Sequence, residues 1–301
     1  MSALSKLMQE VLPVLKRPAL GVALLLGLTA CGAEDFDPKS LLNSYRVVGV
    51  VAEPPTLSLA EESTLSVLDF HPNDVLEGEA RPEVSYSWRL CPLTLGSAVR
   101  YECFIDELEL EGSGPELTVS PAALLAQLGD VMSQLEQTAE MHGPQGESVA
   151  QGALEVYVKL TATPAEGAPV ELVKRLTLNL SPEAPTNSNP SFEGEGVTLS
   201  VAEGSLKVGE EIEVSAMISA SAAETYTPLV AEGEEAQEVT EELIIGWSVS
   251  AGELDGPYAL TADPTTTLTL PDEPQTVRLF TTLRDGRGGL AIHQLDLVVG
   301  E

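Results

Sequence analysis

Short runs of alternating apolar and polar residues recur along most of the chain, separated by proline, glycine, asparagine and acidic clusters. A period of two places successive side chains on opposite faces of a strand, so each run predicts a strand with one buried face. In the first half we expect strands at 45–51, 64–70, 84–90, 116–119, 154–163 and 170–180. In the second half we expect them at 196–201, 211–218, 243–250, 265–270, 276–284 and 289–299. Such a succession of short strands is typical of β-sandwiches.

The two halves of this pattern are similar to each other. The stretch 59–67, Leu-Ala-Glu-Glu-Ser-Thr-Leu-Ser-Val, corresponds to 208–216, Val-Gly-Glu-Glu-Ile-Glu-Val-Ser-Ala. Each half then has one strand centred on a tryptophan, Trp88 or Trp247, and ends in a long two-strand unit. This weak internal repeat indicates duplication of one module. A tryptophan among apolar strand neighbours predicts a core anchor, the alternative being an exposed ring that stacks on a sugar.

A proline-rich segment lies between the halves. It begins Ser181-Pro-Glu-Ala-Pro-Thr-Asn-Ser-Asn-Pro190, which favours an extended chain with nothing to bury. We therefore expect one sandwich over 44–181, a linker over 182–195 and a second sandwich over 196–301. Two modules in series would move relative to each other unless their interface is large.

One segment has helical spacing instead. Apolar residues recur at intervals of three and four from Leu124 to Leu135, a pattern typical of an amphipathic helix. Ser120 suits an N-cap and Gly143 suits a helix exit. We expect a helix over 121–142, inserted in the first sandwich. Its apolar stripe either packs on its own sheet or is offered to a partner protein, and both roles stay open.

The start of the chain has the pattern of a targeting segment. Lys16 and Arg17 precede an uncharged run from Pro18 to Ala30. The run is shorter than the ~20 apolar residues that a membrane-spanning helix needs. A positive flank, a short apolar run and small residues at its end predict a cleaved secretory signal peptide over 1–30.

The run ends in Leu28-Thr29-Ala30-Cys31, which resembles the bacterial lipobox. The resemblance implies that Cys31 becomes the mature first residue, with a thioether-linked diacylglycerol and an amide-linked acyl chain such as palmitate. Several chains, at ~0.8 kcal/mol per buried methylene, make a durable membrane anchor. The alternatives are an ordinary signal with an incidental cysteine, or an uncleaved anchor. By the same resemblance, Gly32 in place of an aspartate favours the outer membrane, and residues 31–43 form an acidic tether.

Trp88, Trp247 and the late hairpin Leu283-Arg-Asp-Gly-Arg-Gly-Gly-Leu290 resemble bacterial extracellular immunoglobulin-like, PKD-like and cadherin-like modules. The resemblance covers most of residues 44–300 and lacks the cysteine pair that antibody-type domains carry across their sheets. It implies an all-β chain of two tandem immunoglobulin-like β-sandwich domains. Together with the lipobox, the chain resembles surface lipoproteins of Gram-negative bacteria.

The charge balance excludes some partners. The chain of 301 residues has 47 acidic and 15 basic side chains, for a net charge of −32. Nucleic acids and anionic lipid headgroups are recognised by basic clusters, so neither is expected to bind the folded surface. Six glutamates between Glu232 and Glu242 predict a solvated loop. Calcium is the alternative that acidity leaves open, with candidate oxygen ligands either at Asp69, Asn73 and Asp74 or at Asp255 and Asp285.

Two cysteines remain besides Cys31. Cys91 and Cys103 enclose a turn after the Trp88 strand, and secretion would place them where disulfides persist. We predict a structural disulfide, worth ~3 kcal/mol in the chain-entropy model. A metal pair or a redox pair is less favoured, because no further Cys or His is near and C-x-x-C is absent.

No catalytic motif stands out. His71, His142 and His293 are scattered, and no nucleophile elbow, phosphate loop or zinc motif is present. We therefore expect a non-catalytic, lipid-anchored envelope protein in adhesion, recognition or scaffolding, with an envelope protein or a glycan as partner and no cofactor. The alternatives are a periplasm-facing accessory lipoprotein that binds through the helix, and a carbohydrate-binding or hydrolytic domain.

Overall fold

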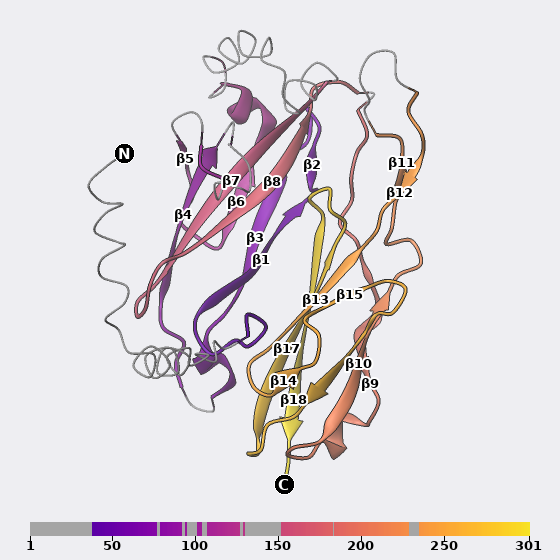
Figure 1. The fold of residues 1–301 in the computed structure, drawn as a ribbon. Coiled ribbons are helices and arrows are strands. Elements are labelled where there is room, and N and C mark those ends of the chain that lie inside the picture. The colour runs from indigo at the N-terminus through magenta and orange to yellow at the C-terminus, as the bar shows by residue number, and fades with distance from the viewer. Residues whose placement is uncertain are drawn as a thin grey trace, which may run out of the picture. The chain divides into compact units, whose positions relative to one another are not determined.

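The computed structural model describes residues 38–76, 79–91, 94, 101–103, 107–126, 129, 152–182, 184–228 and 235–301. Strands dominate these residues (Figure 1). The predicted signal peptide, the lipidation site Cys31 and most of the predicted helix lie outside the described residues.

The first half forms two sheets. One sheet has the order β1-β3-β6, with β1 at Arg46–Glu53, β3 at Ser63–Phe70 and β6 at Glu116–Val119. The other has the order β2-β8-β7-β4-β5, with β2 at Thr56–Leu57, β8 at Val170–Asn179, β7 at Ala153–Pro164, β4 at Val84–Cys91 and β5 at Leu108–Leu110. All pairings are antiparallel except β2 with β8. Leu65 of one sheet and Trp88 and Leu176 of the other share one buried cluster.

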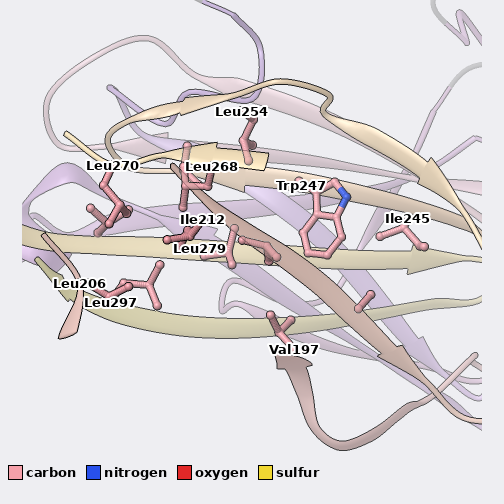
Figure 2. Packing of buried hydrophobic residues seen from close by; sticks show 14 of the residues in the cluster. Val197, Leu206, Ile212, Ile245, Trp247, Leu254, Leu268, Leu270, Leu279 and Leu297 are labelled. Atoms are coloured by element: carbon pink, nitrogen blue, oxygen red, sulfur yellow. The ribbon is translucent and has the colours of Figure 1, made fainter. Parts of the chain in front are cut away.

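The second half also forms two antiparallel sheets. One has the order β14-β16-β10-β9, with β14 at Glu253–Leu254, β16 at Thr265–Thr269, β10 at Glu211–Ile218 and β9 at Phe192–Leu199. The other has the order β15-β13-β17-β18, with β15 at Tyr258–Leu260, β13 at Ile244–Val249, β17 at Gln275–Arg284 and β18 at Leu290–Val299. Figure 2 shows Ile212, Trp247 and Leu279, from both sheets, in the buried cluster of this half. The fold is thus all-β, with two immunoglobulin-like sandwiches in tandem.

The remaining elements are short. They are the 3-10 turns η1 at Pro72–Val75 and η3 at Glu203–Ser205, and the strand pair of β11 at Thr225–Tyr226 and β12 at Val239–Thr240.

Every strand expected from alternation has a counterpart, and β6 and β10 have the predicted bounds. Both tryptophans are 2% exposed, which confirms them as core anchors. The indole nitrogen of Trp88 donates to the carbonyl of Gly114 at 3.0 Å. The strands missed by the sequence interpretation are two or three residues long, too short to show a period.

The described start of the predicted helix packs on its own sandwich. Residues 121–126 are helical, and the amide of Leu124 donates to the carbonyl of Ser120 at 3.0 Å. Leu124 is 1% exposed within the first core, and Leu125 packs against that core. In this first turn, the apolar stripe is therefore used inside the protein.

Two predicted spacers are partly folded. The linker was expected over 182–195, but β9 begins at Phe192. The tether was expected over 31–43, but the amide of Leu42 donates to the carbonyl of Val249 at 2.7 Å, and Leu42 is 1% exposed. The side chain of Leu42 is buried because it shares an apolar cluster with Phe70 and Phe280. The residues just before β1 are thereby joined to β13 of the second sandwich.

Candidate functional site

The turn between β17 and β18 closes on its own carboxylate. The Oδ1 atom of Asp285 accepts hydrogen bonds from the amides of Arg287 at 2.7 Å, Gly288 at 3.0 Å and Gly289 at 2.9 Å. Gly286 and Gly288 have φ angles of 77° and 114°, a region that side chains rarely adopt. The sequence Asp-Gly-Arg-Gly-Gly therefore forms the expected hairpin turn, and it does so with Asp285 buried at 5% exposure.

Arg287 links this turn to three other segments. Its guanidinium donates to Glu241 at 2.8 Å, to Glu224 at 3.3 Å and to the carbonyl of Thr186 at 2.6 Å. It also lies 3.8 Å from the ring centroid of Tyr226, a cation–π contact. The side chain of Glu241 is 1% exposed, so the prediction of a solvated acidic loop is wrong at this residue. A buried carboxylate of this kind needs a paired cation.

The proline-rich linker contributes amide side chains to the junction, by which we mean the β17–β18 turn and the segments of the linker and of the first sandwich that contact the β17–β18 hairpin. The Nδ2 of Asn187 donates to Asp285 at 2.7 Å, and Asn187 is 5% exposed. The Nδ2 of Asn189 donates to the carbonyl of Ala52 in β1 at 2.7 Å, while its Oδ1 accepts from the amide of Leu290 in β18 at 2.9 Å. The expectation that this segment has nothing to bury is therefore wrong. Asparagine satisfies both a donor and an acceptor there.

Apolar contacts accompany these polar ones. Phe70 of β3 and Phe280 of β17 meet edge-to-face at 6.1 Å, and both are 1% exposed. Gly49 of β1 lies so close to β18 that a Cβ atom there would come within 2.8 Å of Leu290. The two sandwiches are therefore joined by a packed apolar contact as well as by hydrogen bonds.

Lys174 of β8 is buried at this junction. It is 7% exposed, and its Nζ donates to the carbonyl of Gly288. Burial, opposed by the attraction of Asp285 and aided by the repulsion of Arg284 and Arg175, lowers the pKa of Lys174 to about 8. The neighbouring Arg175 donates to the carbonyl of Gly286 and lies 3.4 Å from Glu155.

A cleft of about 390 Å³ opens beside Lys174. The residues that line it include the basic residues Lys174, Arg175 and Arg284 and the apolar residues Val50, Leu172 and Leu290. The chain has only 15 basic residues, and three of them line this one cleft. The cleft is therefore unusually basic for so acidic a protein.

The predicted disulfide is present. Cys91 and Cys103 are bonded, and Cys91 at the end of β4 is fully buried. Cys31 lies outside the described residues, so lipidation stays a prediction.

The calcium candidates do not gather. Asp69 accepts from the hydroxyls of Tyr45 at 2.8 Å and Tyr86 at 2.7 Å and pairs with Arg81, while Asp74 accepts from the amide of His71 at 2.8 Å. Over the residues that the structure places, no three His, Cys, Asp or Glu side chains come together as a metal ion would require. Burial, and to a smaller extent the hydrogen bond and charge of Asp69, raise the pKa of Tyr86 to about 12.

The histidines have local roles. The Nδ1 of His71 accepts from the amide of Asn73 at 3.2 Å, and the ring of His293 lies 6.0 Å from that of Phe192. His142 lies outside the described residues.

The sequence interpretation missed the junction residues Lys174, Arg287 and Asn187. One signal was available for Lys174, which shares its strand face with the buried Leu176 and Leu178. A lysine in phase with a core stripe indicates a buried amine that needs a partner. Asn187 carried no such signal, because its partner Asp285 is 98 residues away in sequence.

No family model matches this chain, and no curated protein sequence matches it. Three solved structures illustrate what it is similar to. The FN1-FN3 domains of chicken CNTN1 are 12% identical, with 85% of this chain and 67% of that chain covered and a TM-score of 0.22. The N-terminal Ig1-2 module of the Drosophila receptor protein tyrosine phosphatase DLAR is 9% identical, with 86% and 100% covered and a TM-score of 0.25. The D0-D1 domain of Intimin is 10% identical, with 84% and 98% covered and a TM-score of 0.21.

None of the helices among the residues that the structure describes has the length and hydropathy that a membrane span requires.

Proposed function

We propose that this chain is a lipid-anchored, non-catalytic recognition or scaffolding protein of the bacterial cell envelope, in which the two sandwiches act as one body. The observation that carries the proposal is the junction. Lys174, Asn189 and the buried Phe70–Phe280 pair tie strands of the first sandwich to the β17–β18 hairpin of the second. A binding surface that spans two modules requires a fixed geometry, because free rotation at the linker would cost conformational entropy on binding.

The anchor is supported by the sequence. The run from Pro18 to Ala30 followed by Cys31 has the order of a lipoprotein signal, and Gly32 favours the outer membrane by the same resemblance. The full chain has a net charge of −32, and such an acidic surface is soluble and self-repelling, which suits a protein held at a crowded surface.

The alternatives have less support. An accessory protein that binds a partner through the helix would need the apolar stripe to be free, but Leu124 in its first turn is buried in the first core. A sugar-stacking tryptophan would need an exposed ring, but Trp88 and Trp247 are both buried.

Mass spectrometry of the mature N-terminus tests the anchor. We expect a Cys31 carrying diacylglycerol and an acyl chain in protein extracted from membranes, and a Cys31→Ser variant that loses both the lipid and the membrane association. An unmodified Cys31 in protein recovered without membranes would contradict the proposal. Protease treatment of intact cells then tests location, since a chain that faces outward is cleaved and one that faces the periplasm is protected.

A further inference from the structure

We propose that the cleft beside Lys174 is a binding site for an oxyanion, the carboxylate or phosphate group of a small ligand. The site does not depend on the lipid anchor or on its membrane. It is lined by residues 172–175 of β8 and by the β17–β18 hairpin, so it belongs to both sandwiches.

The charges in the cleft do not cancel. Arg175 is paired with Glu155, and Lys174 is attracted by Asp285. Arg284 lines the cleft and makes no ion pair within the part of the chain that the structure describes. One guanidinium is therefore left without a counter-charge, although acidic residues outnumber basic ones about threefold in the sequence. Such a fork of N–H donors matches a carboxylate or phosphate in a bidentate geometry.

Repulsion among the cations also favours a bound oxyanion. Besides burial, the positive charges of Arg284 and Arg175 lower the pKa of Lys174. The Oδ1 of Asp285 accepts from the amides of the turn and its Oδ2 accepts from Asn187. That carboxylate is therefore held in the turn. The Nζ of Lys174 donates to one carbonyl, whereas an ammonium has three donors. A bound oxyanion would supply the missing negative charge.

The size of the cleft sets the class of ligand. A volume of about 390 Å³ lies at the small end of the ~300–1,000 Å³ range of ligand sites. Val50, Leu172 and Leu290 offer apolar walls on which the uncharged body of a small molecule can pack. The cleft therefore fits a sugar acid or a small phosphate compound, and the two share the oxyanion that the cations recognise.

The test is a titration of the whole mature protein with inorganic phosphate in one arm and D-glucuronate in the other, at matched ionic strength adjusted with sodium chloride. The readouts are calorimetry and the backbone amide shifts of Gly286 and Gly288. We expect saturable binding in at least one arm, with shift changes centred on these two glycines. The more effective arm identifies the oxyanion. Because the protein as a whole repels anions, general charge attraction does not produce such a response.

Two variants with the same change of charge locate the site. Arg284→Gln removes the unpaired guanidinium and should weaken binding at least tenfold. Arg89→Gln removes a half-exposed arginine of β4, which pairs with Glu107, and should change the affinity less than twofold. Because Arg284 is exposed, the first variant should fold, and a thermal melt checks it. Absence of saturable shifts in both arms, or equal losses in both variants, would overturn the proposal.

Discussion

At the scale of single residues, Arg287 and Glu241 form the most enclosed charge pair at the junction. Their N–O distance is 2.8 Å, and the exposed fractions of the side chains are 16% and 1%. Truncating the cation leaves a buried carboxylate without its partner, whereas a pair at the surface contributes only ~0–1 kcal/mol.

We therefore predict that Arg287→Met lowers the free energy of unfolding by ~3–5 kcal/mol in urea titrations. Arg89→Met, which breaks the half-exposed pair with Glu107, is the control and should cost ~1 kcal/mol or less. The double variant Arg287→Met with Glu241→Gln should recover part of the loss, because no charge is then left buried. Equal effects of the two arginine variants would show that the Arg287–Glu241 pair contributes no more to stability than the half-exposed pair.

The buried amine of Lys174 predicts that the free energy of unfolding depends on pH. Its folded pKa is lowered to about 8 by burial, while an unfolded lysine has a pKa of ~10.4. Between these values the unfolded chain binds more protons than the folded one, so the contribution of Lys174 to stability rises with pH across that window. Below pH 8 both states carry the proton, and the buried ammonium remains unfavourable.

Urea unfolding from pH 7 to pH 10 measures this contribution. We expect the stability of the wild type to gain up to ~3 kcal/mol over this range relative to Lys174→Met, which has no proton to lose. The upper limit keeps small the contribution of Tyr86, whose folded pKa is raised to about 12 and which lowers stability as pH rises from ~10, and the comparison with Lys174→Met cancels the rest. Parallel pH profiles for the two proteins would refute the prediction.

At the scale of elements, the β17–β18 hairpin depends on its glycines. A Cβ atom at Gly289 would lie 2.1 Å from the Oδ2 of Asp285 and 3.0 Å from the carbonyl oxygen of Ser188. We predict that Gly289→Ala destabilises the protein by more than ~2 kcal/mol, since it displaces a buried carboxylate and the linker together. Gly204 in η3 has open space around its Cβ position, so Gly204→Ala should change stability by less than ~0.5 kcal/mol. Thermal melts of both variants make the comparison.

The elements also show what sequence can and cannot predict here. Long strands with one buried face were predicted correctly because the alternation of apolar and polar residues is visible within a few neighbouring positions, as in β10. The disulfide followed from spacing and compartment. The junction did not follow, because its contacts join residues far apart in sequence, such as Asn189 and Ala52, which are separated by 137 positions. An asparagine in a proline-rich segment has the same local signature whether it faces water or a partner.

At the scale of the whole molecule, each sandwich carries its own reporter. Trp88 lies in the first core and Trp247 in the second, so Trp247→Phe leaves a fluorophore in the first sandwich and Trp88→Phe leaves one in the second. If the junction couples the sandwiches, the two reporters should show urea transitions at the same midpoint once the stability of each single variant is allowed for. Coincident transitions are the test of cooperative unfolding.

Breaking the junction should separate the two transitions. Asp285→Ala removes the carboxylate that closes the hairpin turn, binds Asn187 and attracts Lys174, yet Asp285 belongs to neither of the two sandwich cores. In that background we predict distinct midpoints for the two reporters, with both cores still folded in the absence of urea. Asp263→Ala is the matched control, because Asp263 is exposed and its side chain bonds only to Thr265, two residues away, in the interactions described. Coincident midpoints in Asp285→Ala would show that the apolar contact of Phe70 with Phe280 is sufficient to couple the sandwiches. Separate midpoints in the wild-type protein would show that the sandwiches are not coupled at all.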